Sequence, residues 1–388
     1  MRPITLWDIF RSQGSWPLKG IKLLDHTLGS IVCRCLGRSR TDSSVLPSGP
    51  MKVLIIRPGG IGDAVLLLPV LRELKRGGHT LDILCEKRNV AVFRSQPGLC
   101  GQIFCYDVLG ELTAVGRNSY DWVVDTEQWH CLSAVLSRLI RSRRTIGFGT
   151  RPERAGLFYT AVEYSHEAYE LHNFSRLFSL LGLRGRLHLE GSYAVSAPDI
   201  AWAKASLSRP YAALALGGSS AARRFSSEQL VLMGRLIIDS GLNVVLLGGG
   251  DMKVFAGKLL DEMKSPGVVS FVGKTSLAQS VALVAGARCF IGQDSGLLHI
   301  AAALSVPSVA VFGPGNRNKW APENTRTFFV DSGLLCSPCT FFGYAVPQCH
   351  GTYPCLRSPE LTVRLLQAVK EILSYVQNVP AGAKKGDE

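Results

Sequence analysis

Apolar runs and amphipathic segments alternate along most of this chain. Residues 52–58, KVLIIRP, form a short continuous apolar run, which predicts a strand buried on both faces of a parallel sheet. Residues 62–78, GDAVLLLPVLRELKRGG, predict a helix that ends at Gly77–Gly78. Strands are predicted again at TLDILCE, QIFCYD and YDWVVDT, and a helix at LSAVLSRLIRS. This order predicts an α/β fold with a mostly parallel, doubly wound sheet.

The alternation restarts near residue 210. The predicted strands there are YAALALGG, LNVVLLGGG, ARCFIGQ and SVAVFGP, and the predicted helices are SSEQLVLMGRLIIDSG, SLAQSVALVAGA and DSGLLHIAAALSV. We therefore expect two similar domains, over residues 51–200 and 201–358, joined near SAPDIAWAKASLSRP. The glycine-rich turns follow predicted strands, and ligands of open α/β sheets bind at those carboxyl ends.

Residues 1–50 precede this pattern and differ from it. Apolar residues recur there at helical spacing, at Ile21, Leu24, Leu28, Ile31, Val32 and Cys35. Basic residues flank them, at Lys19, Lys22, Arg34, Arg38 and Arg40. Two interpretations stay open: a helix packed on the main body, or a basic amphipathic helix that lies in a membrane interface. The following TDSSVLPSGP is rich in Ser, Pro and Gly, which is typical of a linker.

Length and charge narrow the choice of partners. The 388 residues suit two domains, and the net charge of +13 points to an anionic partner: nucleic acid, a membrane surface or a phosphorylated substrate. The basic residues are spread along the chain without a long basic block, so we expect no nucleic-acid partner.

The length of the apolar runs and the contexts of the cysteines indicate the cellular compartment of the protein. No apolar run reaches roughly 18 residues, so no segment is predicted to span a membrane, and the N-terminus lacks a signal-peptide pattern. Most of the 11 cysteines lie singly in apolar contexts, as Cys85 and Cys289 do, which indicates reduced core thiols. We therefore expect a cytoplasmic protein.

The turn RPGGIGD joins the first strand to its helix. Gly60 and Gly62 permit close approach to the backbone, and the helix start offers free N–H groups to an anion. The spacing matches neither a dinucleotide fingerprint nor a phosphate-binding P-loop. Asp63 has two open interpretations: an acid in the first helical turn, favoured by the helix dipole, or a carboxylate that accepts a proton.

FIGQDSGLLHIAAAL joins another predicted strand to a helix. Asp294 or Ser295 can cap this helix, and Ser295 and Gly296 can then present N–H groups and a hydroxyl to a diphosphate. His299 follows Asp294 by five residues, near the same helix end. It is either a core histidine or a residue that faces the same ligand.

Two further strand ends carry charged residues. Arg223 and Arg224 follow the strand and turn YAALALGGSSAA, and arginine suits phosphate through its fork of donors; solvated surface charges are the alternative. Asp251 follows LLGGG, where an acid can accept hydrogen bonds from ribose hydroxyls, although GGGD is also ordinary turn chemistry.

A dense basic run, SRLIRSRRTIGFGTRPERAG, lies in the first domain. Arg141 and Arg144 within it are candidates for binding an anionic acceptor or membrane headgroups, and a solvated face is the alternative.

The C-terminal region gathers four cysteines, Cys336, Cys339, Cys349 and Cys355. The first two have the C-x-x-C spacing of metal sites, and the second two are spaced more loosely. A structural metal, free thiols and a redox-labile pair all remain open.

These segments together resemble glycosyltransferase family 9, the heptosyltransferases of lipopolysaccharide core assembly. The resemblance rests on KVLIIRPGGIGDAVLLLPVL, the ARRF region, FIGQDSGLLHIAAALSVPSVAVFGP and the terminal cysteine pattern, over about residues 51–357. It implies a GT-B fold: two facing Rossmann-like domains, the first for the acceptor and the second for the donor, with a cleft between them. It also implies that a C-terminal helix within residues 359–388 crosses back to the first domain, before a polar tail.

The resemblance implies a reaction as well. The donor is expected to be ADP-heptose, and the acceptor an anionic lipid-linked saccharide at the inner face of the inner membrane, where the protein is peripheral. Transfer is expected to be inverting and independent of metal, with no cofactor required for catalysis. Asp63 corresponds to the proposed general base, and Asp294, Ser295, Gly296 and His299 to the donor-binding segment.

The chain departs from the family at two positions. Arg223 or Arg224 stands where many members have a lysine for the donor phosphates, and Asp251 stands near where members place a glutamate for the ribose. Two alternative functions remain: a transferase of the same fold that uses another nucleotide sugar, and a non-catalytic relative that only binds one.

Overall fold

The computed structural model describes residues 23, 25–37, 49–217, 221–324, 326–341, 344–345, 349 and 352–378. Outside them lie parts of our expectations: Ile21, Leu24, most of the flanking basic residues, nearly all of the linker, the glycine and serines at 218–220, and the polar tail. The chain divides into two compact units, Met1–Ser192 with Phe341–Val346 and Tyr193–Thr340 with Pro347–Glu388.

The division falls at residue 192 instead of residue 200. Helix α10 (Ala197–Ser206) therefore belongs to the second unit, because it packs against α13 (Leu277–Ala285).

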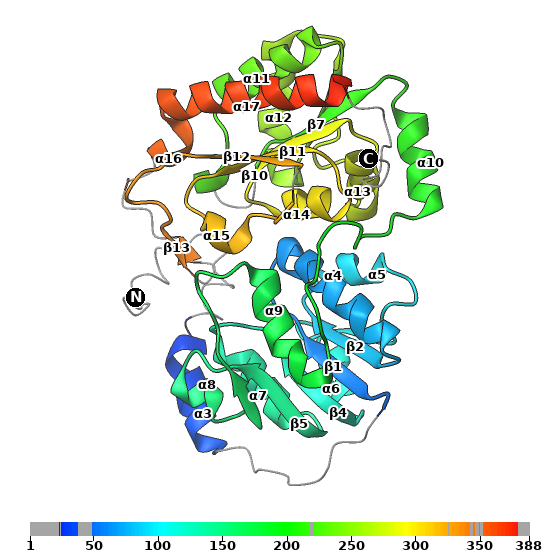
Figure 1. Ribbon diagram of the computed structural model, residues 1–388, viewed down its shortest axis with the longest axis vertical. Coiled ribbons are helices and arrows are strands. Elements are labelled where there is room, and N and C mark those ends of the chain that lie inside the picture. Colours follow the sequence, from blue (N-terminus) through cyan, green and yellow to red (C-terminus); the bar gives the residue numbers. More distant parts are fainter. Residues whose placement is uncertain are drawn as a thin grey trace. The chain divides into compact units, whose positions relative to one another are not determined.

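The first unit contains six parallel strands in the order β3-β2-β1-β4-β5-β6 (Figure 1). Its strands are β1 (Lys52–Ile56), β2 (Thr80–Cys85), β3 (Ile103–Cys105), β4 (Tyr120–Asp125), β5 (Ser142–Phe148) and β6 (Thr160–Val162). Its helices are η1 (Asp25–Gly29), α3 (Ser30–Cys35), α4 (Ile61–Arg76), α5 (Val90–Arg94), α6 (Leu109–Gly116), α7 (Cys131–Leu139), α8 (Pro152–Ala155), α9 (Glu170–Phe178) and η2 (Ser179–Leu181).

Strand β1 is central because both of its neighbours pair with it in parallel. Ile56 lies opposite Leu84 of β2 and opposite Asp125 of β4. Helices cover both faces of the sheet, so that Val53–Ile56 are fully buried, as the continuous apolar run predicted. The order of the strands reverses at β1 and β4, and their carboxyl ends form the switch point where ligands of such sheets bind.

The second unit repeats this topology, with six parallel strands in the order β12-β11-β10-β7-β8-β9. Its strands are β7 (Tyr211–Ala215), β8 (Asn243–Leu247), β9 (Val268–Ser270), β10 (Cys289–Gln293), β11 (Ser308–Phe312) and β12 (Thr327–Asp331), and a separate pair is formed by β13 (Thr340–Phe341) and β14 (Tyr344–Ala345). Its remaining helices are η3 (Ala221–Arg223), α11 (Ser227–Asp239), η4 (Gly250–Met252), α12 (Lys253–Met263), α14 (Gly296–Ala303), α15 (Arg317–Trp320), α16 (Pro354–Arg357) and α17 (Pro359–Asn378).

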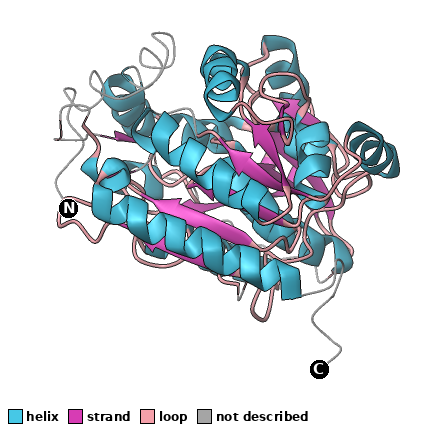
Figure 2. Ribbon diagram, turned by 90° about the horizontal axis from the view of Figure 1, so that it is seen from above, coloured by secondary structure: helices cyan, strands magenta, loops and turns pink. Residues whose placement is uncertain are grey.

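The two sheets confirm the expected fold class: α/β, of GT-B type, with a Rossmann-like sheet in each unit. In Figure 2 helices lie along the strands in the view from above. None of the described helices combines the length and the apolar character that a membrane span needs.

Helix α17 corrects one expectation. We expected it to cross back to the first domain, but its apolar stripe, which includes Leu361, Leu365, Val369 and Ile372, is buried in the core of the second unit. It packs there on β10, β11 and β12 and beside α11. A stripe of this width needs one apolar partner surface, and the second sheet supplies it.

Strand β5 is a second difference from the sequence pattern. The sequence pattern predicted no strand at the basic run around Arg143 and Arg144, yet Ser142–Phe148 pair in parallel with β4 and β6. Arg144 lies within this strand, and two aromatic rings accommodate its charge. Its guanidinium stacks on Tyr159, 4.6 Å from the ring centre, and on Trp122 of β4 at 5.7 Å.

We expect Leu365→Ala to lower the free energy of unfolding by about 2–5 kcal/mol, because Leu365 is fully buried and its truncation leaves a cavity. Val363→Ala is the matched control, since Val363 lies on the same helix with 68% of its surface exposed. Urea unfolding followed by circular dichroism measures both. Equal effects of the two substitutions would contradict the packing of α17 on the second sheet.

Candidate functional site

In the first unit Asp63 lies directly beyond the carboxyl end of β1 and is held at both of its oxygens. Oδ2 accepts the backbone N–H of Gly60 at 2.8 Å, and Oδ1 lies 2.8 Å from Nη2 of Arg57. The side chain is 24% exposed. Asp63 therefore stabilises the start of α4, as expected for an acid in the first helical turn. It still presents part of its carboxylate to solvent.

Arg57 is the buried counterpart of this carboxylate. It is 1% exposed, and Nη1 donates to the backbone oxygen and the hydroxyl of Thr126, at 2.8 and 3.2 Å. Its guanidinium also lies over the ring of Phe174, 5.3 Å from the ring centre. These contacts with the residue after β4 and with α9 hold the Arg57 guanidinium in one orientation. Asp63 therefore pairs with a cation whose position is fixed.

Gly59 makes this arrangement possible. Its φ of +114° favours glycine, and a Cβ atom there would lie 3.0 Å from Oδ2 of Asp63 and 3.2 Å from Nη2 of Arg57. Gly60 and Gly62, which we expected near the acceptor, lie in the same turn and the first turn of α4.

The carboxyl end of β2 adds a second acid beside this turn. Glu86 accepts the backbone N–H of Gly59 at 3.3 Å and is bonded by the Tyr106 hydroxyl and by Arg88. Arg88 remains 52% exposed. The edge of the sheet therefore carries both signs of charge, with an arginine and a carboxylate in contact with solvent.

The loop after β4 is held by a buried arginine. Arg154 is fully buried; Nη2 donates to Oδ2 of Asp125 at 2.9 Å and to the backbone oxygen of Glu127 at 2.8 Å, and Nη1 donates to the backbone oxygen of His130. Burial opposes ionisation of the Glu127 carboxyl, but the charges of His130, Arg57 and Arg154 outweigh burial and hold its pKa below the usual range. Glu127 is thus a second buried carboxylate at this edge.

The N-terminal extension reaches the same corner. Asp25 of η1 accepts the backbone N–H groups of Cys131 and Leu132, at 3.1 and 2.6 Å, and its Oδ2 lies 3.1 Å from Nδ1 of His130. Burial would raise the pKa of Asp25, but the bonds and charge from His130 and from these two N–H groups keep it below its usual range. Asp25 therefore acts as the N-cap that α7 lacks in its own sequence.

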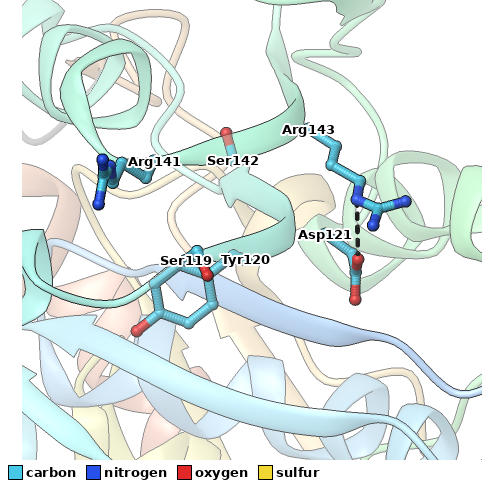
Figure 3. A pocket seen from close by; sticks show the side chains of 6 residues that line it. All are labelled: Ser119, Tyr120, Asp121, Arg141, Ser142 and Arg143. Carbon is cyan, nitrogen blue, oxygen red and sulfur yellow. Dashed lines mark ion pairs between the residues drawn. The ribbon is translucent and has the colours of Figure 1, made fainter. Parts of the chain in front are cut away.

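Arg141 and Arg144 lie elsewhere. They stand at the amino-terminal end of β5, whereas Asp63 lies beyond the carboxyl end of β1. The six residues of β4 separate these two edges of the sheet by about 17 Å. A pocket at their edge is lined by Ser119, Tyr120, Asp121, Arg141, Ser142 and Arg143 (Figure 3). Figure 3 shows Arg143 directed at Asp121, with Nε 3.5 Å from Oδ1. The structure does not bring this basic group together with Asp63.

The second unit brings the predicted donor residues together at its own switch point. Arg223 follows β7 and Asp294 follows β10, and the two strands are neighbours. Nη1 of Arg223 lies 3.4 Å from Oδ2 of Asp294 and 3.5 Å from its backbone oxygen. The Arg223 side chain is 26% exposed, whereas Asp294 is buried. Within this pair the exposed charge is thus positive.

Helix α14 begins beside this pair. Ser295 is its N-cap residue, and in the part of the chain that the structure describes its buried hydroxyl has no hydrogen-bond partner. A Cβ at Gly315 would lie 2.2 Å from the Asp294 carboxylate, so the loop after β11 closes over that side chain because it has glycine there. Gly296 opens the helix, and its first N–H groups lack partners within the helix.

His299 and Asp251 occupy less central positions. His299 is 3% exposed and packs edge-to-face on Trp320, with ring centres 6.3 Å apart. Asp251 lies after β8, and its Oδ2 is 2.7 Å from Nη2 of Arg224, with 60% of the Asp251 side chain exposed. This second pair joins the ends of β7 and β8 next to the Arg223–Asp294 pair.

The four C-terminal cysteines lie in one neighbourhood as free thiols. Burial, together with the nearby thiols of Cys339, Cys349 and Cys336, raises the pKa of Cys355 to about 11. Among the described residues no three His, Cys, Asp or Glu side chains are placed to hold a metal ion. Of the three interpretations left open for these cysteines, the described residues show free thiols.

With this geometry in view, the model of glycosyltransferase family 9 (heptosyltransferase) matches residues 112–344. The chain belongs to glycosyltransferase family 9. The match covers both units, from α6 to the pair β13–β14, and so confirms the family that the sequence motifs indicated.

Individual relatives agree with this family. A lipooligosaccharide heptosyltransferase 2 from Haemophilus ducreyi is 30% identical over 122 residues, which are 29% of this chain and 35% of that protein. The alignment with this chain thus covers about a third of that relative's length. A lipopolysaccharide heptosyltransferase 1 from Salmonella typhimurium is 25% identical over 286 residues, 68% of this chain and 89% of that protein.

A solved structure shares the fold. The E. coli ADP-heptose lipopolysaccharide heptosyltransferase II matches with a TM-score of 0.67 at 20% identity, over 84% of this chain and 100% of that one. At 20% identity this similarity concerns the fold alone.

Sequence reasoning missed several residues of the first unit's edge, namely Arg57, Glu86, Arg88, Glu127 and Arg154. A usable signal existed for three of them, because Arg57, Glu86 and Glu127 stand within two residues of the end of a buried strand. In a parallel sheet such positions converge on one edge. The burial of Arg154 had no comparable signal.

We expect Arg154→Met to lower the free energy of unfolding by about 3–5 kcal/mol, because it leaves the buried Asp125 carboxylate without its partner. The matched control is Arg143→Met, which removes an arginine that is 60% exposed and 3.5 Å from Asp121. Chemical denaturation of both variants provides the measurement. If Arg154→Met were no more destabilising than the control, the buried network would not hold the β4 loop.

Proposed function

We propose that this family 9 protein transfers a heptose or related sugar from ADP-heptose to a lipid-linked saccharide, in lipopolysaccharide core or related surface glycan synthesis. The observation that carries the proposal is the contrast between two equivalent sheet edges. One presents a fixed carboxylate, Asp63, and the other presents a fixed arginine, Arg223, beside the start of α14.

Asp63 is suited to accept a proton from an acceptor hydroxyl. The contacts to Arg57 and the Gly60 N–H set the orientation of the carboxylate, and a quarter of the side chain stays open to a substrate. A general base must lie within hydrogen-bond reach of the proton that it takes, and a fixed rotamer meets that condition without further ordering.

The second unit is suited to hold the ADP group. Arg223 can bond the diphosphate, while Ser295 and Gly296 offer a hydroxyl and N–H groups at a helix start. Asp294 fixes Arg223 by their ion pair. Arg224, Asp251 and His299 remain proposed donor residues, with Asp251 proposed to accept hydrogen bonds from the ribose hydroxyls.

The proposed reaction is balanced without another reagent. The acceptor O–H bond breaks and its proton passes to Asp63, while the oxygen forms a bond to the anomeric carbon. The bond from that carbon to the ADP oxygen breaks, and ADP leaves with the electron pair. Attack from the face opposite ADP inverts the configuration. Arg223 and the helix start stabilise the leaving diphosphate, so we propose that neither metal nor cofactor is required.

The proposal for the acceptor substrate is supported by the net charge of the chain and by its family. The chain carries a net charge of +13, which suits an anionic saccharide at a membrane surface. We propose that the protein acts in the cytoplasm, peripherally at the inner face of the inner membrane, and that the first unit binds the acceptor near Asp63, Gly60 and Gly62.

We expect Asp63→Asn to reduce turnover by about 10²–10⁴-fold, because asparagine keeps the helix contact and cannot accept the proton. Asp121→Asn is the matched control: Asp121 is an equally exposed carboxylate, 25%, at the opposite edge of the same sheet. Release of ADP from ADP-heptose with acceptor measures both variants. Near-normal turnover of Asp63→Asn, with donor binding intact, would remove Asp63 from the role of base.

We expect the protein to bind ADP selectively over UDP, GDP and CMP in calorimetric titrations, and Arg223→Gln to weaken that binding about 10–100-fold. Arg235→Gln, which removes an exposed arginine of α11 in the same unit, is the control and should bind as the parent does. Selective binding of another nucleotide would overturn the donor, and binding unaffected by Arg223→Gln would move the phosphate site elsewhere.

A further inference from the structure

The described part of the N-terminal extension is a short helical segment, η1 and α3, with two apolar faces. One face is buried: Cys33 packs with Cys131, Ala134, Leu157 and Phe158 in a small core of the first unit. The other face consists of Leu28, Ile31, Val32 and Cys35, at helical spacing of three, four and seven residues, and it is exposed. Leu28, Ile31 and Val32 are 52%, 54% and 41% exposed. We call these four residues the extension face.

The extension face is held in place by polar contacts on the buried side. Asp25 caps α7, and Ser30 donates to Glu153 and accepts from Arg151, at 3.0 and 2.5 Å. Arg151 and Glu153 are also paired with each other at 2.6 Å. The helix therefore has a fixed orientation on the first unit, and its outward apolar side chains are a property of that orientation.

The extension packs on loops at the edge of the sheet that carries Asp63. Asp25 contacts the loop after β4 through His130, and Arg151, which follows β5, stacks on Trp129 at 5.2 Å. These loops follow the carboxyl ends of β4 and β5, the same edge at which α4 begins with Asp63. Leu132, at the start of α7, is a further exposed apolar residue of the first unit, with 41% of its surface exposed.

The charges around the face favour a negatively charged partner. Arg34 is exposed on α3 itself, beside Val32 and Cys35. The two acids of this corner are already engaged, Asp25 with His130 and Glu153 with Arg151. Exposed apolar side chains flanked by an exposed arginine match a bilayer with anionic headgroups, which takes up apolar side chains and attracts the cation.

We propose that the extension face docks on an anionic lipid bilayer and holds the Asp63 edge of the first unit at the membrane surface. This inference rests on the proposed function for the nature of the acceptor, but its evidence is the orientation of α3. It assigns apolar contact with the bilayer to the extension.

Co-sedimentation of the full chain with vesicles tests the proposal. We expect binding to phosphatidylglycerol vesicles and much weaker binding to phosphatidylcholine vesicles, with the former reduced by salt. The double substitution Leu28→Gln and Ile31→Gln should weaken binding to phosphatidylglycerol vesicles by about tenfold or more, because both apolar side chains leave the interface. Arg34→Gln should weaken it less and reduce its dependence on salt.

The matched control is the double substitution Leu109→Gln and Val254→Gln, two residues of α6 and α12 that are 79% and 76% exposed. It should bind vesicles as the parent does. Equal loss in both double variants, no binding by the parent, or a change of oligomeric state in place of lipid binding would overturn the proposal. Circular dichroism of the same preparations shows that each variant is folded, and calorimetric titration with ADP tests the donor site separately. A parent that binds vesicles but not ADP would contradict the proposed function and leave this inference standing.

Discussion

The buried guanidinium of Arg57 is the charge around which the edge of the first sheet is arranged. A buried cation needs compensating partners, and Arg57 finds them on three elements: Asp63 of α4 and Thr126 after β4 accept hydrogen bonds from its Nη atoms, and the ring of Phe174 in α9 lies beside its guanidinium. Together with His130 and Arg154, this charge holds the pKa of the buried Glu127 carboxyl below its usual range. Arg57 thus orients Asp63, bonds the start of the β4 loop and lies against the close turn at Gly59.

The two units share one topology but expose opposite charges from their arginine–aspartate pairs. Each places an arginine–aspartate pair at the switch point of a sheet with the same strand order. In the first unit the arginine is buried and the carboxylate reaches solvent; in the second the carboxylate of Asp294 is buried and Arg223 reaches solvent. Burial of one partner thus decides whether an edge offers a proton acceptor or an anion site. A glycosyl transfer from a nucleotide donor needs one of each.

The sequence predicted the central strands of both sheets, because β1, β7 and β10 are continuous apolar runs, and it predicted the positions of Asp63, Arg223 and Asp294 beyond them. It failed where a charged side chain is stabilised by distant partners. Arg144 within β5 depends on Trp122 and Tyr159, and Arg57 depends on a residue 69 positions away. Likewise, the periodicity of α17 predicts a helix with one apolar face but does not say which sheet that face covers, and the family resemblance indicated the wrong one.

The contact of Asp25 with α7 has a consequence for how the chain folds. The residues that it joins are 106 positions apart, so the contact is among those that pay a large loop-closure entropy. The extension is synthesised before β4 and α7 but can dock only after they have been made. Until then the first N–H groups of α7 have no side-chain cap, so the start of that helix is completed by a segment far away in the sequence.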